Sequence, residues 1–187
     1  MDSEAKEIEL KLRVAPEDIV VLRNHPHFAR ALHNPSREML DSVYFDSDNR
    51  FLRDHGLTLR VRHIGNKRIQ TVKATTDCVG CFERSEWAQT IEGDQPDLSR
   101  AKDTALGPIL NDDVRNVLKP VFEIRIARTS YHLNGNRTNI MMAVDEGQIV
   151  AADSSCPVSE IELELKQGNP AELFKIARDI ITNQSLI

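Results

Sequence analysis

Polar and apolar residues alternate with a period of two in many short segments of the chain. The first such segment covers residues 6–14, where Ile8, Leu10 and Leu12 alternate with charged residues. This alternation is typical of β-strands that have one polar and one apolar face. The same pattern predicts strands at residues 40–45, 57–63, 67–74, 82–91, 121–133, 139–145, 148–151 and 158–166. Turn residues lie between them, at Gly65-Asn66, Gly80, Asn134-Gly135-Asn136 and Glu146-Gly147.

Helical patterns are fewer. Pro16, followed by two acidic residues, suits the first turn of a helix, and Ile19, Leu22 and Phe28 continue an apolar stripe. Residues 98–117 are expected to hold one or two short helices. A last helix is predicted after Asn169-Pro170, with an apolar stripe formed by Leu173, Phe174, Ile176, Ala177 and Ile180. The chain contains no repeat or low-complexity tract, so residues 1–187 are predicted to form a single α+β domain dominated by antiparallel strands.

The composition of the chain excludes several kinds of function and location. The 187 residues include 40% hydrophobic residues, enough for a real core, and the net charge of −5 argues against a general nucleic-acid binder. The polar start of the chain does not resemble a signal peptide, and no run of about 20 apolar residues predicts a membrane span. Three cysteines suit a reducing compartment, so we expect a cytoplasmic protein.

Charges of one sign are concentrated on particular predicted strands. The first strand places Glu7, Glu9 and Lys11 on one face, and the last one places Glu160, Glu162 and Glu164 on one face. The strands between them carry mainly cations on the polar face. These cations are Arg60, Arg62, Lys73, Arg84 (two residues before Glu86) and Arg128.

Each strand taken alone is best explained as a solvated face of a half-exposed sheet. The set is harder to explain in this way, because adjacent glutamates repel one another and because a merely soluble surface intersperses the two signs. A sheet curled with these faces inward would form a charged cavity. Its carboxylates would hold Mg²⁺ or Mn²⁺, and its cations would hold phosphate oxygens. The proposed cations are Lys11, Arg60, Arg62, Lys73, Arg84 and Arg128, and the proposed anions are Glu7, Glu9, Glu86, Asp145, Glu160, Glu162 and Glu164.

Three other features favour ordinary structural roles. Cys78 and Cys81 form a lone CxxC without the four ligands of structural zinc, which favours a hairpin tip. His25 and His27 flank Pro26 near a predicted helix end, which favours a surface position. Trp87 faces away from Glu86 and is expected to pack under a helix.

Seven short motifs occur in order along almost the whole chain. They are Glu7-Ile8-Glu9-Leu10-Lys11, Tyr44-Phe45-Asp46-Ser47, Gly56-Leu57-Thr58-Leu59-Arg60-Val61-Arg62, Gln70-Thr71-Val72-Lys73, Arg84-Ser85-Glu86-Trp87, Val144-Asp145-Glu146-Gly147 and Glu160-Ile161-Glu162-Leu163-Glu164. This series resembles the CYTH domain family, the triphosphate tunnel metalloenzymes. The Arg-x-Glu-Trp motif and the closing glutamate strand resemble the bacterial inorganic triphosphatases of that family.

The resemblance implies a closed tunnel of antiparallel strands, usually eight, flanked by helices. It also implies an enzyme that hydrolyses tripolyphosphate to pyrophosphate and phosphate with Mg²⁺ or Mn²⁺. Glu7, Glu9 and Lys11 would be catalytic, one metal would lie on Glu7, Glu9 and Glu162, and a second would lie among Glu86, Asp145, Glu160 and Glu164. Some relatives carry a helical domain after this one, so the chain could be excised from a longer protein.

The chain departs from the family pattern at two positions. Ser130 stands where relatives often have a second cation after Arg128, and Arg125 lies on the opposite strand face. Ala88 stands where some relatives have a second acid after Glu86. The alternatives are an adenylate cyclase or a thiamine triphosphatase, both of which would want an aromatic platform, and a non-catalytic polyphosphate-binding module. Aromatic residues make up only 5% of the chain, which argues mildly against the first two.

Overall fold

The computed structural model describes residues 5–31, 35–75, 83–135 and 137–182, and these residues form eight strands with several short helices. The strands are β1 (Ala5–Arg13), β2 (Ser36–Asp46), β3 (Leu57–Ile64), β4 (Lys67–Thr75), β5 (Glu83–Ile91), β6 (Lys119–Asn134), β7 (Asn139–Ala151) and β8 (Ser154–Gln167). The helices are α1 (Pro16–Leu22), α2 (Pro26–Arg30), α3 (Phe51–Asp54), α4 (Asp112–Val117) and α5 (Ala171–Thr182), with 3₁₀ turns η1 (Arg100–Asp103) and η2 (Gly107–Ile109).

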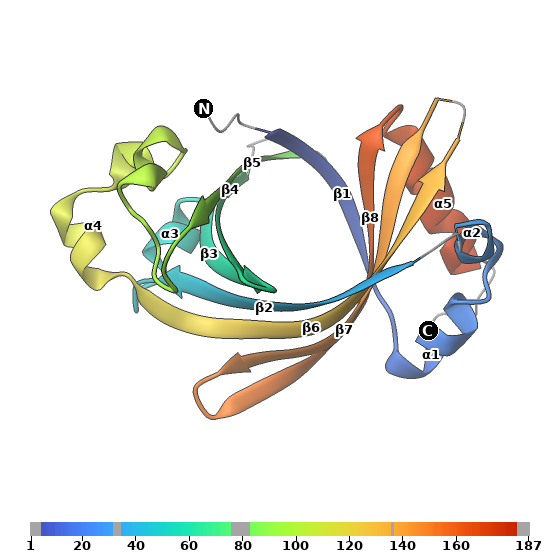
Figure 1. The fold of residues 1–187 in the computed structure, drawn as a ribbon, viewed down its shortest axis with the longest axis horizontal. Helices are drawn as coiled ribbons and strands as arrows, with labels where there is room; N and C mark the ends of the chain where they lie inside the picture. Colours follow the sequence, from blue (N-terminus) through green and yellow to red (C-terminus); the bar gives the residue numbers. More distant parts are fainter. Residues whose placement is uncertain (1–4, 32–34, 76–82, 136, 183–187) are drawn as a thin grey trace. The chain divides into compact units, whose positions relative to one another are not determined.

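The strands form one closed barrel in the order β1-β5-β4-β3-β2-β6-β7-β8 (Figure 1). Each pair whose register is known is antiparallel. The predicted α+β fold, a closed eight-stranded antiparallel barrel with flanking helices, is therefore confirmed. Among the described residues, no helix has the length and apolar character that crossing a membrane requires.

The turn predicted at Glu146-Gly147 is wrong. Strand β7 runs through both residues without a break, and the chain turns after Ala151, where Ala152 adopts a left-handed φ of 48°. The two strands predicted at 139–145 and 148–151 are therefore one, and the Asp-x-Gly hairpin implied by the resemblance is absent at these residues. A glycine inside a strand weakens it but does not end it when neighbouring strands pair on both sides.

The apolar stripe of Ile19, Leu22 and Phe28 is divided between two helices. Pro26 begins α2, and the preceding His25 has the extended backbone that a following proline favours (φ −62°, ψ 142°). The predicted surface position of His25 is wrong, since the residue is only 6% exposed. Its side chain caps α2 by accepting a hydrogen bond from the backbone N–H of His27. The Cys78–Cys81 pair lies outside the described residues.

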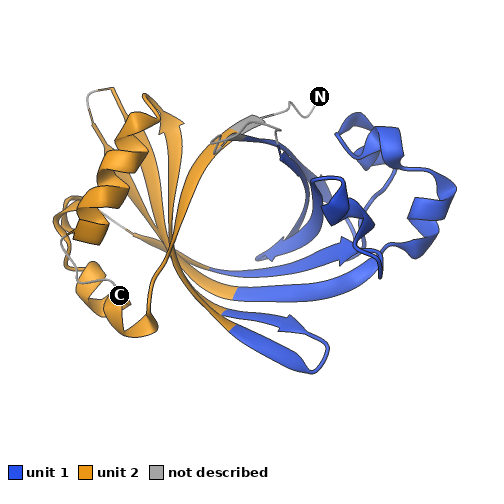
Figure 2. Ribbon diagram, turned by 180° about the vertical axis from the view of Figure 1, so that it is seen from behind, with its two compact units in different colours: residues 1–6, 39–125, 148–156 blue, residues 7–38, 126–147, 157–187 orange. Residues whose placement is uncertain are grey.

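The chain divides into two compact units, shown in different colours in Figure 2. Unit 1 comprises residues 1–6, 39–125 and 148–156, and unit 2 comprises residues 7–38, 126–147 and 157–187. Each unit has its own hydrophobic core on one face of its strands. The charged residues of the same strands lie on the opposite face, because strand side chains alternate.

In unit 1, the apolar residues of β3, including Leu59 and Val61, pack with Leu52 of α3 and with Ala101 and Leu106 around η1 and η2. Trp87 is half-buried against this core, as predicted for a packing residue. In unit 2, the apolar face of β1 and β8 packs against residues of α1, α2 and α5. The residues at the centre of this packing are Leu10, Ile161, Leu163, Ile19, Leu22, Phe28, Leu173 and Ile180.

Candidate metal and phosphate site

Strands β1 and β8 bring the two acidic segments of the sequence side by side in unit 2. Lys11 lies opposite Glu162, Glu9 lies opposite Glu164, and Arg13 lies opposite Glu160. Residues that face each other across an antiparallel pair share a sheet face, so both acidic stripes lie on one charged face. The packing of Leu10 and Leu163 on the other face fixes this register, since a slip by one residue would bury the glutamates in the core.

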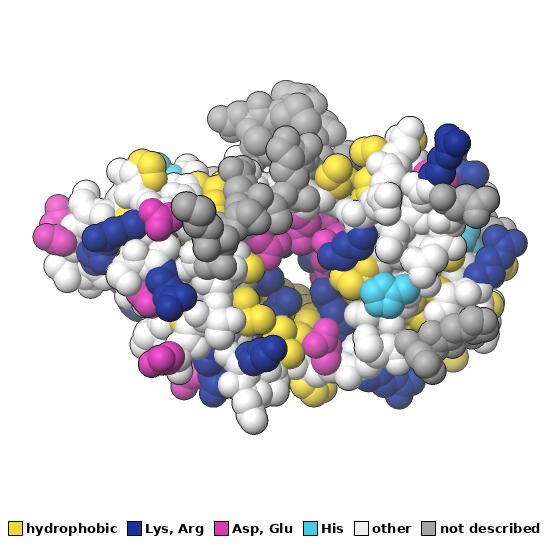
Figure 3. Space-filling model, turned by 45° about the horizontal axis from the view of Figure 1, so that its top comes forward, with side chains coloured by type: hydrophobic (Ala, Val, Ile, Leu, Met, Phe, Trp, Pro, Cys, Tyr) yellow, Lys and Arg dark blue, Asp and Glu magenta, His cyan; other side chains and the backbone are white. Residues whose placement is uncertain are grey.

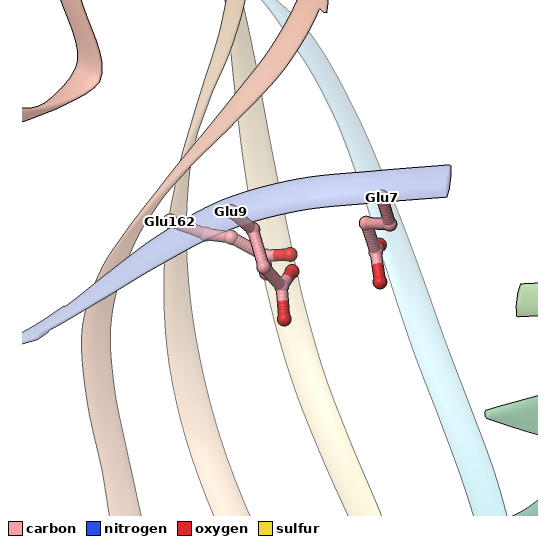
Figure 4. Close-up of side chains that lie close together, drawn as sticks. All are labelled: Glu7, Glu9 and Glu162. Carbon is pink, nitrogen blue, oxygen red and sulfur yellow. The ribbon is translucent and has the colours of Figure 1, made fainter. Parts of the chain in front are cut away.

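Three carboxylates of this face meet in one group. Glu7, Glu9 and Glu162 each offer an oxygen that lies within 4.8 Å of the others. Figure 4 shows Glu7 and Glu9 projecting from the same side of β1, with Glu162 reaching toward Glu9 from β8. Three convergent carboxylates form the hard oxygen donor set that Mg²⁺ and Mn²⁺ prefer, so these residues fit a divalent cation.

The protonation of this group supports the same assignment. Burial, together with the hydrogen bond and negative charge of Glu162, raises the pKa of Glu9 to about 8. Burial also acts to raise the pKa of Glu162, but the hydrogen bond from Glu9 and the charges of Lys11 and Arg128 outweigh it and hold that pKa below its ordinary value. In the absence of metal, Glu9 thus carries a proton that relieves the repulsion among these carboxylates. A divalent cation would replace that proton.

A second carboxylate group shares Glu162 with the first. Asp145 and Glu160 each have an oxygen within 4.8 Å of the other and of Glu162. Asp145 is 1% exposed and forms two hydrogen bonds with the guanidinium of Arg128, which also bonds Glu162. These anions outweigh the burial of the guanidinium, so the pKa of Arg128 is raised above its ordinary value.

Lys11 lies among the carboxylates of unit 2 and remains partly accessible. Its Nζ is 3.3 Å from Oε2 of Glu162 and 3.6 Å from Oε1 of Glu160, and its side chain is 42% exposed. Burial acts to lower the pKa of Lys11, but the charges of Glu162, Glu9 and Glu160 outweigh it and raise that pKa. Lys11 is therefore a positively charged hydrogen-bond donor beside the carboxylate group of Glu7, Glu9 and Glu162.

The predicted cations of unit 1 also share one strand face. Arg60 and Arg62 of β3 lie on the face opposite the buried Leu59 and Val61, and Nε of Arg62 donates to Oγ of Ser42 at 2.9 Å. Lys73 lies opposite Glu86 in the β4–β5 register. Arg84, two residues before Glu86 in β5, lies opposite Thr75 in the same register.

Glu86 holds two of these cations in place. Its carboxylate lies 3.2 Å from Nζ of Lys73 and 4.0 Å from Nη2 of Arg60. Neither Glu86 nor Glu164 belongs to the two carboxylate groups found among the described residues, although both were expected to bind metal. Glu164 instead pairs with Lys166 at 2.5 Å.

One departure from the family pattern, Ser130, lies in strand β6 together with Arg125. Arg125 is 55% exposed and pairs with Glu123 at 2.6 Å, while Ser130 is buried. Arg125 therefore does not replace the cation that is missing at position 130. On the face shown in Figure 3, acidic and basic side chains are interspersed over unit 1 at the left of the view.

Sequence reasoning missed the role of Asp46. Its buried carboxylate accepts hydrogen bonds from the backbone N–H groups of Ser47, Leu52 and Arg53, at 2.7, 2.8 and 3.2 Å. Asp46 therefore holds the turn after β2 and the start of α3. The Asp–Ser pair just before a short helix was the available signal, because such residues favour helix N-termini.

An aromatic platform was also missed. The rings of Tyr44 and Phe122 stack with centroids 4.5 Å apart and planes inclined by 15°. They line a cavity of about 650 Å³ in unit 1, together with Arg50 and Arg53. The two aromatics are 78 residues apart in sequence (122 minus 44), so no local pattern could have paired them.

The chain is thus a closed antiparallel barrel with a carboxylate group on β1 and β8 that fits a divalent cation, and with cations on β3, β4 and β5 that fit phosphate oxygens. Comparison with known proteins identifies the family. The CYTH domain model matches residues 5–186, and the chain belongs to the CYTH domain family.

Individual relatives agree with this placement. The chain is 30% identical over 171 residues to an inorganic triphosphatase of Haemophilus influenzae, covering 90% of this chain and 47% of that protein. The chain thus spans about half the length of this curated relative.

Two solved structures have a similar fold. One is a putative adenylyl cyclase from Hippeastrum described as having a dominant triphosphatase activity, with a TM-score of 0.63, 14% identity and coverage of 98% of this chain and 89% of that one. The other is a protein of Pyrococcus horikoshii, with a TM-score of 0.61, 18% identity and coverage of 94% and 90%. At these identities the likeness establishes the fold alone.

Proposed function

We propose that the chain is an inorganic triphosphatase that hydrolyses tripolyphosphate to pyrophosphate and phosphate with Mg²⁺ or Mn²⁺. The observation that carries this proposal is the convergence of Glu7, Glu9 and Glu162 beside the charged Lys11. The similarity to the inorganic triphosphatase of Haemophilus influenzae, over 90% of this chain, supports it.

The carboxylates of unit 2 are assigned to metal binding. Glu7, Glu9 and Glu162 would hold the cation, and Glu9 would release its proton as the cation binds. When bound, a divalent cation supplies a Lewis acid that offsets phosphate charge and makes water more acidic.

The basic residues are assigned to the phosphate chain. Phosphoryl transfer requires little covalent chemistry from a protein and depends on positioning and on stabilising charge. Lys11, as a point charge close to the metal group, would contact the phosphate that is transferred. Within unit 1, Arg60, Arg62, Lys73 and Arg84 are cations suited to phosphate oxygens, and Glu86 pairs with Lys73 and Arg60.

A second candidate function is hydrolysis of a triphosphate that carries an organic ring. The stacked Tyr44 and Phe122, in a cavity with Arg50 and Arg53, provide the aromatic platform that the sequence did not reveal. An aromatic face beside arginines suits a planar ring. This observation keeps ATP and thiamine triphosphate among the substrates to be tested.

The deciding experiment is a substrate panel. Phosphate release is measured from tripolyphosphate, ATP and thiamine triphosphate, first with Mg²⁺ and then with Mn²⁺. Metal-dependent release from tripolyphosphate well above release from the other two supports the proposal. Preferred hydrolysis of ATP or thiamine triphosphate supports the second candidate, cyclic nucleotide formation indicates a cyclase, and binding without release indicates a polyphosphate-binding module.

A further inference from the structure

The cavity that Tyr44 and Phe122 line in unit 1 has the features of a ligand site in its own right. Its volume of about 650 Å³ falls within the range of small-molecule pockets, which is about 300–1,000 Å³. All of its lining residues belong to unit 1, and none of them belongs to the two carboxylate groups of unit 2. The proposed hydrolysis of tripolyphosphate leaves this cavity without a role.

The aromatic pair offers an apolar surface to the cavity. The rings of Tyr44 and Phe122 stack on each other with centroids 4.5 Å apart, and both residues are only half-buried. Both side chains line the cavity, so part of the ring surface faces it. Covering such a surface with a planar ring is favourable, as in proteins that stack nucleotide bases on aromatic side chains. The pair therefore favours a ligand with a planar ring.

Two arginines that form no ion pair line the same cavity. Arg50 and Arg53 are both exposed, and neither has an ion-pair partner among the residues that the structure describes. The acidic side chains of the cavity are already engaged, since Asp46 accepts three backbone hydrogen bonds and Asp48 pairs with Lys119 at 2.6 Å. The two guanidinium groups are thus left to bind an anion, and their planar fork suits phosphate oxygens.

The backbone of Arg50 adds an independent observation. Arg50 has a left-handed φ of 59°, a conformation that glycine and asparagine adopt more easily than arginine. Residues held in this way lower stability and are concentrated at functional sites. The hydrogen bonds of the turn use only the backbone of Arg50, whose N–H donates to the carbonyl of Ser47 and whose carbonyl accepts from the N–H of Asp54. A guanidinium needed in the cavity gives a reason for an arginine at this strained position.

We propose that this cavity binds a nucleoside monophosphate, with the base stacked on the aromatic pair and the phosphate held by Arg50 and Arg53. A phosphate monoester carries a charge of about −1.5 to −2 at neutral pH, which matches two arginines. No metal ion is needed, because both carboxylates of the cavity already have partners. The ligand is held and not cleaved, so this site goes beyond the proposed function and differs from the second candidate function.

Calorimetry with AMP in the presence of EDTA tests the site in the unaltered protein. One AMP per chain is expected, with adenosine and inorganic phosphate each bound at least about tenfold more weakly, because each lacks one half of the contacts. Binding of AMP only when Mn²⁺ replaces EDTA would overturn the proposal, since it would assign the phosphate to a metal. Inorganic phosphate bound as tightly as AMP would also overturn it, since the ring would then contribute nothing.

Two variants test the named contacts. Arg50→Asn removes the guanidinium and introduces a residue that tolerates the left-handed backbone, and Phe122→Leu removes one ring but keeps an apolar side chain. Arg125→Gln and Phe174→Leu are the matched controls, at exposed positions outside the cavity. We expect the Kd for AMP to rise about tenfold or more in Arg50→Asn and about fivefold or more in Phe122→Leu, and to stay within about twofold in both controls.

Unchanged AMP affinity in Arg50→Asn and Phe122→Leu, with both variants folded by circular dichroism, would overturn the assignment of this cavity. An unaltered protein that binds no AMP at millimolar concentration would overturn it directly. These measurements use neither a metal ion nor tripolyphosphate. A failure to bind AMP therefore leaves the proposed function standing, and a failure to hydrolyse tripolyphosphate leaves the nucleotide site standing.

Discussion

At the scale of single residues, Glu9 is the group expected to set how the candidate metal site responds to pH. Its pKa is raised to about 8, first by burial and then by Glu162, so below that pH the metal-free group holds a proton. A divalent cation binds carboxylates only in the ionised form, and it must displace this proton. We therefore expect metal affinity at this group to depend on pH in the physiological range.

The expected result is that Mn²⁺ affinity rises by up to about tenfold between pH 6.5 and pH 7.5 and levels off above about pH 8. Calorimetric titrations at several pH values measure this directly. Glu9→Gln should bind Mn²⁺ more weakly and lose most of the pH dependence, whereas Glu123→Gln, at a partly exposed position of β6, should behave like the unaltered protein. A flat affinity across this range would contradict the assignment of Glu9 as a ligand.

Gly56 is a second residue with a clear physical role. It has a left-handed φ of +68°, and a Cβ added to it would lie 2.5 Å from Oγ1 of Thr75. Gly65 also has a left-handed φ, of +56°, but a Cβ there would meet nothing within 4 Å. The two glycines thus separate the cost of the backbone conformation from the cost of the contact.

Gly65→Ala is expected to lower the free energy of unfolding by about 1 kcal/mol, the backbone cost alone. Gly56→Ala should lower it by about 1 kcal/mol more, because Thr75 must also give up its hydrogen bond to the carbonyl of Gly56. Urea denaturation of the two variants measures the difference. Equal losses in both would show that Thr75 moves aside without cost.

At the scale of elements, the two-faced strands and the starts of α1 and α5 could be predicted from the sequence, but the break between α1 and α2 could not. The period of two places Glu7, Glu9 and Lys11 on one face because successive side chains point in opposite directions. The break between α1 and α2 depends on Pro26, a local signal that the apolar stripe from Ile19 to Phe28 obscured. The cap that His25 provides was not predicted, because histidine is not among the residues that usually begin helices.

His25 is expected to make the stability of α2 depend on pH. Its pKa is lowered below the usual value, first by burial and then by the neighbouring His27, which stacks on it, while Asp179 of α5 acts in the opposite direction. The native state thus binds fewer protons at this site than the unfolded state near pH 6. By linkage, the stability contributed by His25 is present above pH 6.5 and is lost as the pH falls below it.

Urea midpoints measured between pH 7.5 and pH 5.5 test this expectation. His25→Asn keeps an acceptor for the cap but does not titrate, so it should lose less stability on acidification than the unaltered protein. His25→Ala should be destabilised at both pH values, by about 1 kcal/mol, because it removes the cap. His132→Asn, at an exposed position of β6, is the control and should follow the unaltered protein. Parallel acid responses of His25→Asn and the unaltered protein would show that another group titrates.

At the scale of the whole molecule, closing the barrel determines which charged strands become neighbours. The sequence indicated that the first and last strands are acidic, but their pairing follows from barrel closure, which joins β1 to β8. Which carboxylates meet depends on register, so the Glu7–Glu9–Glu162 group was anticipated only through the family resemblance. The pairing of Arg128 with Asp145 depends on the position of β6 relative to β7 and was not anticipated at all.

The most direct test of the central claim measures phosphate release from tripolyphosphate in the presence and absence of Mg²⁺, for the unaltered protein, Glu9→Gln and Glu123→Gln. We predict release that requires Mg²⁺, a loss of at least about 100-fold in folded Glu9→Gln, and no significant change in Glu123→Gln. Turnover of folded Glu9→Gln at the rate of the unaltered protein would contradict the assignment of the metal site.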